Sequence, residues 1–107
     1  MLPYEITPED VRAKLVVGET LTLLDVREPW EVAIATIEGA KEIAMGEVPR
    51  RVDELDRETP LVIYCHHGVR SLKVAYWLRQ NGFEKAQSMS GGIDAWSRVI
   101  DGTVGRY

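Results

Sequence analysis

The chain has 107 residues but only one cysteine, two histidines and one phenylalanine. A single cysteine excludes an internal disulfide framework, so nothing in the sequence indicates an oxidising compartment. No apolar run approaches the ~20 residues that a transmembrane helix needs. The first residues also lack the basic stretch and apolar core of a signal peptide. We therefore expect a cytoplasmic protein that has no membrane partner.

Basic side chains are in the minority, and the formal net charge is −4. Residues 1–60 carry 14 acidic and 7 basic side chains, whereas residues 61–107 carry 3 acidic and 6 basic ones. The chain has no basic stripe interleaved with aromatic residues, which argues against a nucleic-acid partner. The positive second part suits an anionic substrate or an acidic partner tail. Solvated surface charge alone also accounts for an asymmetry of this size.

Short apolar segments alternate with amphipathic ones along the whole chain. Strands are predicted over residues 21–26, 39–44, 61–64 and 86–90, and helices over residues 7–18, 28–35, 48–55, 70–81 and 93–100. Val11, Leu15 and Val16 form the predicted core face of the first helix, and residues 101–107 are predicted to be a polar tail. Strands separated by helices at short intervals predict a parallel sheet covered on both faces. The length predicts one domain over residues 1–107.

The only cysteine, Cys65, stands where the strand over residues 61–64 ends and the next helix begins. Ligands of parallel sheets bind at the carboxyl ends of the strands. Backbone N–H groups of such a turn, with the positive end of a helix dipole behind them, stabilise a thiolate. Gly68 permits a backbone conformation that other residues avoid, and Arg70 adds a permanent positive charge. The predicted anion-binding loop around the nucleophile Cys65 consists of His66, His67, Gly68, Val69 and Arg70.

A cysteine at the end of a buried strand also fits a second role, that of a small apolar core residue. In that interpretation His66, His67 and Arg70 form only a polar loop. A glycine, an arginine and a helix start within six residues favour the reactive thiol. A metal held by His66 and His67 beside Cys65 is not expected, because adjacent residues rarely converge on one ion and the chain offers no further pair of ligands.

Four stretches together give the chain a resemblance to the single-domain rhodanese-like sulfurtransferases. They are Leu24–Glu28, Ile37–Ala40, Cys65–Arg70 and Gly91–Trp96. The resemblance implies an α/β fold with a five-stranded, mainly parallel sheet and helices on both faces. It also implies that Cys65 takes up a sulfane sulfur as a persulfide, and that the amides of the loop over His66 to Arg70 surround the outer sulfur. The family often has a histidine where this chain has Thr36, so any hydrogen bond of that histidine does not carry over.

The same resemblance implies the reaction partners of the protein. The sulfur donor would be thiosulfate or another persulfide, and the acceptor a small thiol, cyanide or a sulfur-carrier protein. Sulfur would move by two displacements through the thiolate of Cys65, and neither displacement needs a cofactor.

Supporting residues are expected around the loop. Asp25 and Arg27 match the Asp-Val-Arg stretch of the family, and we interpret them as structural, through an ion pair or hydrogen bonds that anchor a turn, with Arg27 near Glu31. Gly91 and Gly92 are expected to permit close packing beside the loop. Only packing roles are expected for the three tryptophans, Trp30, Trp77 and Trp96.

Two other functions compete with sulfur transfer. Cysteine-dependent phosphatases also place a thiolate and an arginine on one loop, but their loops are one residue longer than the four residues between Cys65 and Arg70. The shorter loop forms a tighter ring of amides, which fits one sulfur atom better than a tetrahedral phosphate. The second competitor is a rhodanese-like binding or regulatory module. Such modules commonly lack the cysteine, so the presence of Cys65 argues against this alternative.

Overall fold

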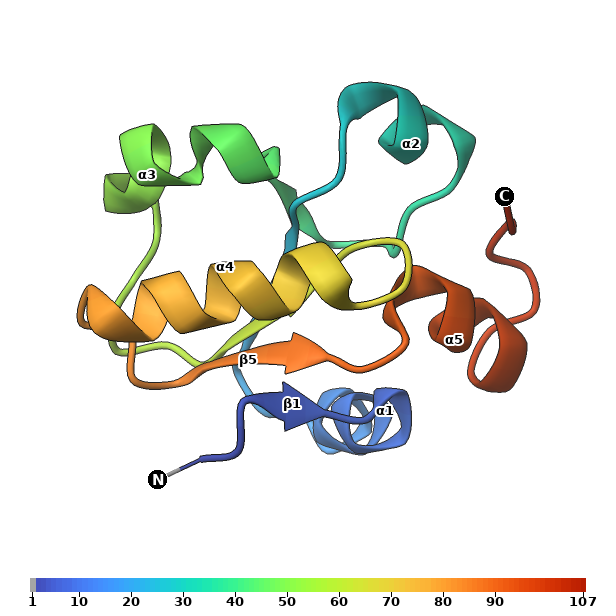
Figure 1. Cartoon of the computed structure of the whole chain (residues 1–107). Helices are drawn as coiled ribbons and strands as arrows, with labels where there is room; N and C mark the ends of the chain where they lie inside the picture. Colours follow the sequence, from blue (N-terminus) through green and yellow to red (C-terminus); the bar gives the residue numbers. More distant parts are fainter. Residues whose placement is uncertain (1) are drawn as a thin grey trace.

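The computed structural model of the chain describes residues 2–107 (Figure 1). It contains one sheet of five parallel strands. The strands are β1 (Glu5–Ile6), β2 (Thr22–Asp25), β3 (Lys41–Glu42), β4 (Leu61–Tyr64) and β5 (Ala86–Met89), in the spatial order β1-β5-β4-β2-β3. The α-helices are α1 (Pro8–Val16), α2 (Pro29–Ile34), α3 (Val48–Arg51), α4 (Val69–Gln80) and α5 (Gly92–Val99). Two short 3₁₀ helices, η1 (Met45–Glu47) and η2 (Val52–Glu54), flank α3.

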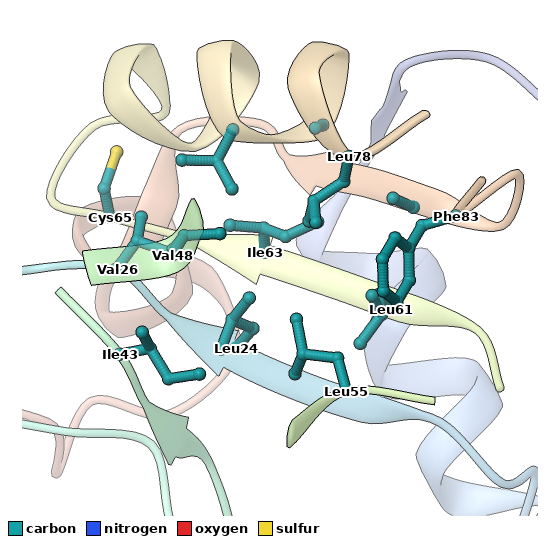
Figure 2. Packing of buried hydrophobic residues seen from close by; sticks show 13 residues of the cluster. Leu24, Val26, Ile43, Val48, Leu55, Leu61, Ile63, Cys65, Leu78 and Phe83 are labelled. Carbon is teal, nitrogen blue, oxygen red and sulfur yellow. The ribbon is translucent and has the colours of Figure 1, made fainter. Parts of the chain in front are cut away.

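Apolar side chains cover both faces of the sheet. Because successive side chains of a strand point to opposite faces, Leu61 and Ile63 of β4 face one layer and Val62 faces the other. The first layer contains buried residues of α3 and α4, and Cys65 lies at one end of it (Figure 2). The second layer contains buried residues of α1 and α5. The predicted five-stranded parallel sheet with helices on both faces is confirmed.

The predicted helices and strands agree with the structure to within a few residues. The strand before Cys65 has the predicted bounds, and α4 begins one residue earlier than expected. The predicted helix over residues 48–55 is divided into α3 and η2. The sequence analysis missed β1, whose two residues pair with Ser88 and Met89 of β5. None of the helices within residues 2–107 has the length and apolarity to cross a membrane.

The predicted core face of α1 is wrong at two of its three positions. Val11 is fully buried, but Leu15 and Val16 are 39% and 70% exposed. A groove of about 770 Å³ lies beside the end of α1, with Lys14 of α1 and Val62 of β4 among its lining residues.

The predicted polar tail over residues 101–107 is also wrong, because this segment folds back onto the molecule. Val104 and Tyr107 pack against the apolar cluster that holds α1 and α5. The hydroxyl of Ser97 donates to the carbonyl of Val104 at 2.6 Å. Figure 1 shows the end of the chain between α2 and α5, beside the loop that follows β4.

Candidate functional site

Cys65 directly follows β4 and is only 1% exposed. Its sulfur accepts a backbone hydrogen bond from Gly68 at 3.1 Å and a longer one from Ser71 at 3.4 Å. Gly68 has a φ of 101° and precedes the first residue of α4, so the chain reverses tightly enough to turn both N–H groups toward the sulfur. The structure therefore directs two backbone N–H groups at the cysteine sulfur, one from Gly68 in the predicted loop and one from Ser71, which directly follows that loop.

Two buried hydroxyl groups extend this arrangement into the core. The thiol of Cys65 lies 3.4 Å from Oγ of Ser71, and that oxygen lies 2.7 Å from Oγ of Ser88 in β5. Both serines are fully buried. The sequence analysis named neither of them, although Ser71 directly follows Arg70, and a hydroxyl in the first turn of a helix behind a cysteine is a local signal.

The turn between β5 and α5 packs directly against the cysteine loop. Gly92 has a φ of 61°, and a Cβ atom there would lie 2.5 Å from the carbonyl oxygen of Cys65 and as close to that of His66. Because the two backbones lie so close, the first N–H groups of α5 reach the cysteine loop. Ile93 donates to the carbonyl of Cys65 at 2.9 Å, and Asp94 donates to the carbonyl of His66 at 3.1 Å. The close packing expected at Gly91 and Gly92 is present.

Arg70 does not contact the sulfur in this structure. Its guanidinium forms two hydrogen bonds with the carboxylate of Glu31 in α2, at 2.6 and 2.8 Å. Glu31 is 3% exposed. The hydrogen bonds from Arg70 lower the pKa of Glu31 to about 2 against the opposing effect of burial, and Tyr107 adds to the lowering. Arg70 thus ties the end of the loop to α2, and sequence reasoning missed Glu31 as its partner.

Asp25 and Arg27 form an ion pair whose two side chains have no exposed surface. Nε of Arg27 donates to one carboxylate oxygen at 3.0 Å and Nη2 donates to the other at 2.7 Å. The guanidinium also donates to the carbonyl of Glu31 in α2 and to that of Ala35, the residue that directly follows α2. The geometry agrees with a structural role, with the difference that Glu31 offers its carbonyl and not its carboxylate.

The two histidines of the loop stack on each other, with ring centroids 3.9 Å apart. The fold brings Asp94 close to these histidines, which the sequence analysis did not consider. One carboxylate oxygen of Asp94 and one ring nitrogen of each histidine all lie within 4.8 Å of one another. The carboxylate of Asp94 is already paired with Arg98 and Arg106, each at 3.1 Å. Burial and the neighbouring His67 lower the pKa of His66, which favours its neutral form.

The remaining residues named from the sequence differ in their burial. Val69 is exposed at the start of α4, and Thr36 lies 3.4 Å from the hydroxyl of Tyr64, the residue before Cys65. Trp96 is buried in the second apolar layer, as expected. The packing role expected for Trp30 is wrong, because this side chain is 63% exposed; its ring forms a T-shaped pair with the ring of Tyr107.

Comparison with known proteins identifies the family. The family described as "Rhodanese-like domain" matches this chain over residues 7–99. The chain is 35% identical over 94 residues to a sulfurtransferase of Allochromatium vinosum, which covers 88% of each protein. It is 34% identical over 94 residues to the thiosulfate sulfurtransferase GlpE of Actinobacillus pleuropneumoniae, covering 88% of this chain and 86% of the relative.

Solved structures agree with this assignment. The fold superimposes on the crystal structure of a rhodanese-like domain protein from Staphylococcus aureus with a TM-score of 0.85. The two chains are 30% identical, and the match covers 98% of this chain and 99% of the other. The cysteine loop at the end of β4, the parallel sheet and the sequence matches lead to one conclusion: the chain belongs to the rhodanese-like domain family.

Proposed function

We propose that the protein is a sulfurtransferase that carries a sulfane sulfur on Cys65. The donor is thiosulfate or another persulfide, and the acceptor is a small thiol, cyanide or a sulfur-carrier protein. The observation that carries the proposal is the pair of N–H groups, from Gly68 and Ser71, directed at the cysteine sulfur. The names of the relatives from Allochromatium vinosum and Actinobacillus pleuropneumoniae support the same reaction class.

The reaction consists of two displacements at sulfur. In the first, the thiolate of Cys65 attacks the outer sulfur of thiosulfate, a sulfur–sulfur bond to Cys65 forms, and the bond to the sulfonate sulfur breaks. Sulfite leaves with the electron pair of the broken bond. In the second, the acceptor attacks the outer sulfur of the persulfide, and Cys65 leaves as a thiolate. The two displacements move one sulfur atom from donor to acceptor and regenerate the thiolate of Cys65, so no external oxidant or reductant is required.

The protein contributes a fixed set of hydrogen-bond donors to both steps. Negative charge resides on the sulfur of Cys65 before the first displacement and after the second. Gly68 and Ser71 direct backbone N–H groups toward that sulfur and need no rearrangement when the charge appears. The hydroxyl of Ser71 lies within reach of the sulfur, and the hydroxyl of Ser88 holds its oxygen in place.

A mass measurement of the intact protein tests the proposal. After incubation with thiosulfate the wild-type protein should gain the mass of one sulfur atom, and dithiothreitol should remove that mass. A Cys65→Ser variant should gain nothing, and addition of cyanide to the loaded wild-type protein should release thiocyanate. A protein that gains no sulfur from either thiosulfate or a small persulfide would instead support a binding module, and efficient hydrolysis of an aryl phosphate through Cys65 would support a phosphatase.

A further inference from the structure

Tyr107 lies against the start of the cysteine loop, although it is far from the loop in the sequence. Its ring stacks on the ring of His66, with centroids 3.8 Å apart and an interplanar angle of 8°. His66 directly follows Cys65 and in turn stacks on His67. The stack fixes the plane of the His66 side chain, and through it the direction in which the loop leaves β4.

The hydroxyl of Tyr107 acts on the other end of the same loop. It donates to Oε2 of Glu31 at 2.7 Å and accepts from Nη1 of Arg27 at 3.0 Å. Glu31 uses both carboxylate oxygens to hold Arg70, the residue that ends the loop. Burial raises the pKa of Tyr107 to about 12, against the opposing effect of Arg27, so the hydroxyl keeps its proton and stays a donor at neutral pH.

The segment that carries Tyr107 follows the residues that the rhodanese-like domain description matches. The rhodanese-like domain description ends at residue 99, whereas the segment that places Tyr107 covers residues 101–107. The segment is fixed by its own contacts, because Ser97 binds the carbonyl of Val104 and Asp101 accepts hydrogen bonds from both the N–H and the hydroxyl of Thr103. A side chain from the end of the chain therefore contacts His66, the first loop residue after Cys65, and Glu31, the partner of the last loop residue.

We infer that Tyr107 is a positioning residue for sulfur transfer at Cys65. The inference rests on the proposed function. Displacement at sulfur requires the attacking atom, the sulfur and the leaving group to lie in line, and small errors in position slow such a reaction strongly. The N–H of Gly68 in the loop and the N–H of Ser71 directly after it hold the sulfur of Cys65, and Tyr107 holds the two ends of the loop between which Gly68 lies.

Two substitutions separate the ring of Tyr107 from its hydroxyl. Tyr107→Phe keeps the stack on His66, whereas Tyr107→Leu keeps apolar volume but loses both the stack and the hydroxyl. We expect Tyr107→Leu to lower kcat for sulfur transfer from thiosulfate to cyanide about tenfold, with KM changed less than about twofold, and Tyr107→Phe to restore at least about a third of the wild-type kcat. Tyr76→Leu, at an exposed position of α4, is the matched control and should keep the wild-type kcat.

Hydrogen exchange gives a readout that does not depend on activity. In Tyr107→Leu the amides of Gly68 and Ser71 should exchange about tenfold faster, while the amide of Ile63 in β4 keeps its protection, because only the loop is released. A purely structural residue would speed exchange across the whole sheet. That result, or unchanged kcat and unchanged loop exchange in Tyr107→Leu, overturns the inference. So does a Tyr107→Leu variant that fails to fold beside a Tyr107→Phe variant that equals the wild type.

Sulfur uptake by the wild-type protein distinguishes the two proposals. Without uptake the proposed function fails, and the positioning role fails with it. With uptake established by mass, the outcomes for Tyr107→Leu decide the role of Tyr107 alone.

Discussion

At the scale of single residues, the surroundings of the Cys65 sulfur differ between its two protonation states. The thiol donates its proton to Oγ of Ser71. The thiolate has no proton to give, so the hydroxyl of Ser71 must turn and become a donor to the sulfur. Ser88 lowers the free-energy cost of this change, because its Oγ lies 2.7 Å from Oγ of Ser71. The hydroxyl of Ser88 is able to accept from Ser71 in one arrangement and donate to it in the other.

Removal of the Ser71 hydroxyl should therefore lower the rate of sulfur loading strongly and the free energy of unfolding only moderately. In Ser71→Ala we expect the rate of persulfide formation to fall about tenfold or more, as for other preorganised donors. Stability should fall by about 1 to 2 kcal/mol because Ser88 loses a buried partner. Time-resolved mass spectra measure the rate, with Thr59→Ala as a control that removes an exposed hydroxyl at the opposite end of β4. An unchanged loading rate in Ser71→Ala would limit Ser71 to packing.

At the scale of elements, the loop after β4 and the first turn of α5 complete each other's backbone hydrogen bonds. A helix begins with N–H groups that have no partner inside the helix. In α5 two of these groups bind the carbonyls of Cys65 and His66, which a loop without secondary structure would otherwise leave unpaired. This exchange requires the two backbones to approach closely, and the close approach explains the glycine at position 92.

Gly92→Ala should destabilise the contact between the cysteine loop and α5, although alanine has a higher helix propensity than glycine. The new Cβ atom meets backbone and not a movable side chain, and the φ of 61° is strained for alanine. We expect a loss of stability on the order of 3 kcal/mol in urea titrations, together with slower sulfur loading per folded molecule. Gly46→Ala is the matched control, since a Cβ atom there meets nothing within 4 Å. Equal midpoints for the two variants would contradict the prediction.

At the scale of the whole molecule, the sequence predicted what local patterns determine. The strand before Cys65 was found at its observed bounds because an apolar run follows Pro60 and precedes a polar loop. The strand β1 was missed because two residues carry no periodicity, and its pairing with β5 alone makes it a strand. The contact of Arg70 with Glu31 spans 39 residues and that of Tyr107 with Glu31 spans 76, so no local pattern connects the partners.

The buried carboxylate of Glu31 should give the protein an acid-dependent loss of stability. Its pKa falls from the ordinary 4.5 to about 2 on folding, so its contribution is complete above about pH 4.5 and is lost as the pH falls toward 2. Glu31→Gln should therefore be less stable than the wild type by on the order of 2 to 3 kcal/mol at neutral pH, with the difference shrinking toward pH 2. Urea titrations at several pH values measure this, with Glu84→Gln, at an exposed position, as the matched substitution.

The isolation of Cys65 determines how a bound sulfur leaves the protein. A persulfide is discharged early when a neighbouring thiolate attacks its inner sulfur and closes a disulfide, which releases sulfide. This chain has no second cysteine, and Cys65 is too deeply buried for the thiol of another copy to reach the inner sulfur. Under the proposed chemistry the outer atom is the only point of attack. Each molecule then holds one sulfur atom and does not lose it as free sulfide until the attacking atom of an acceptor reaches the outer sulfur in the loop.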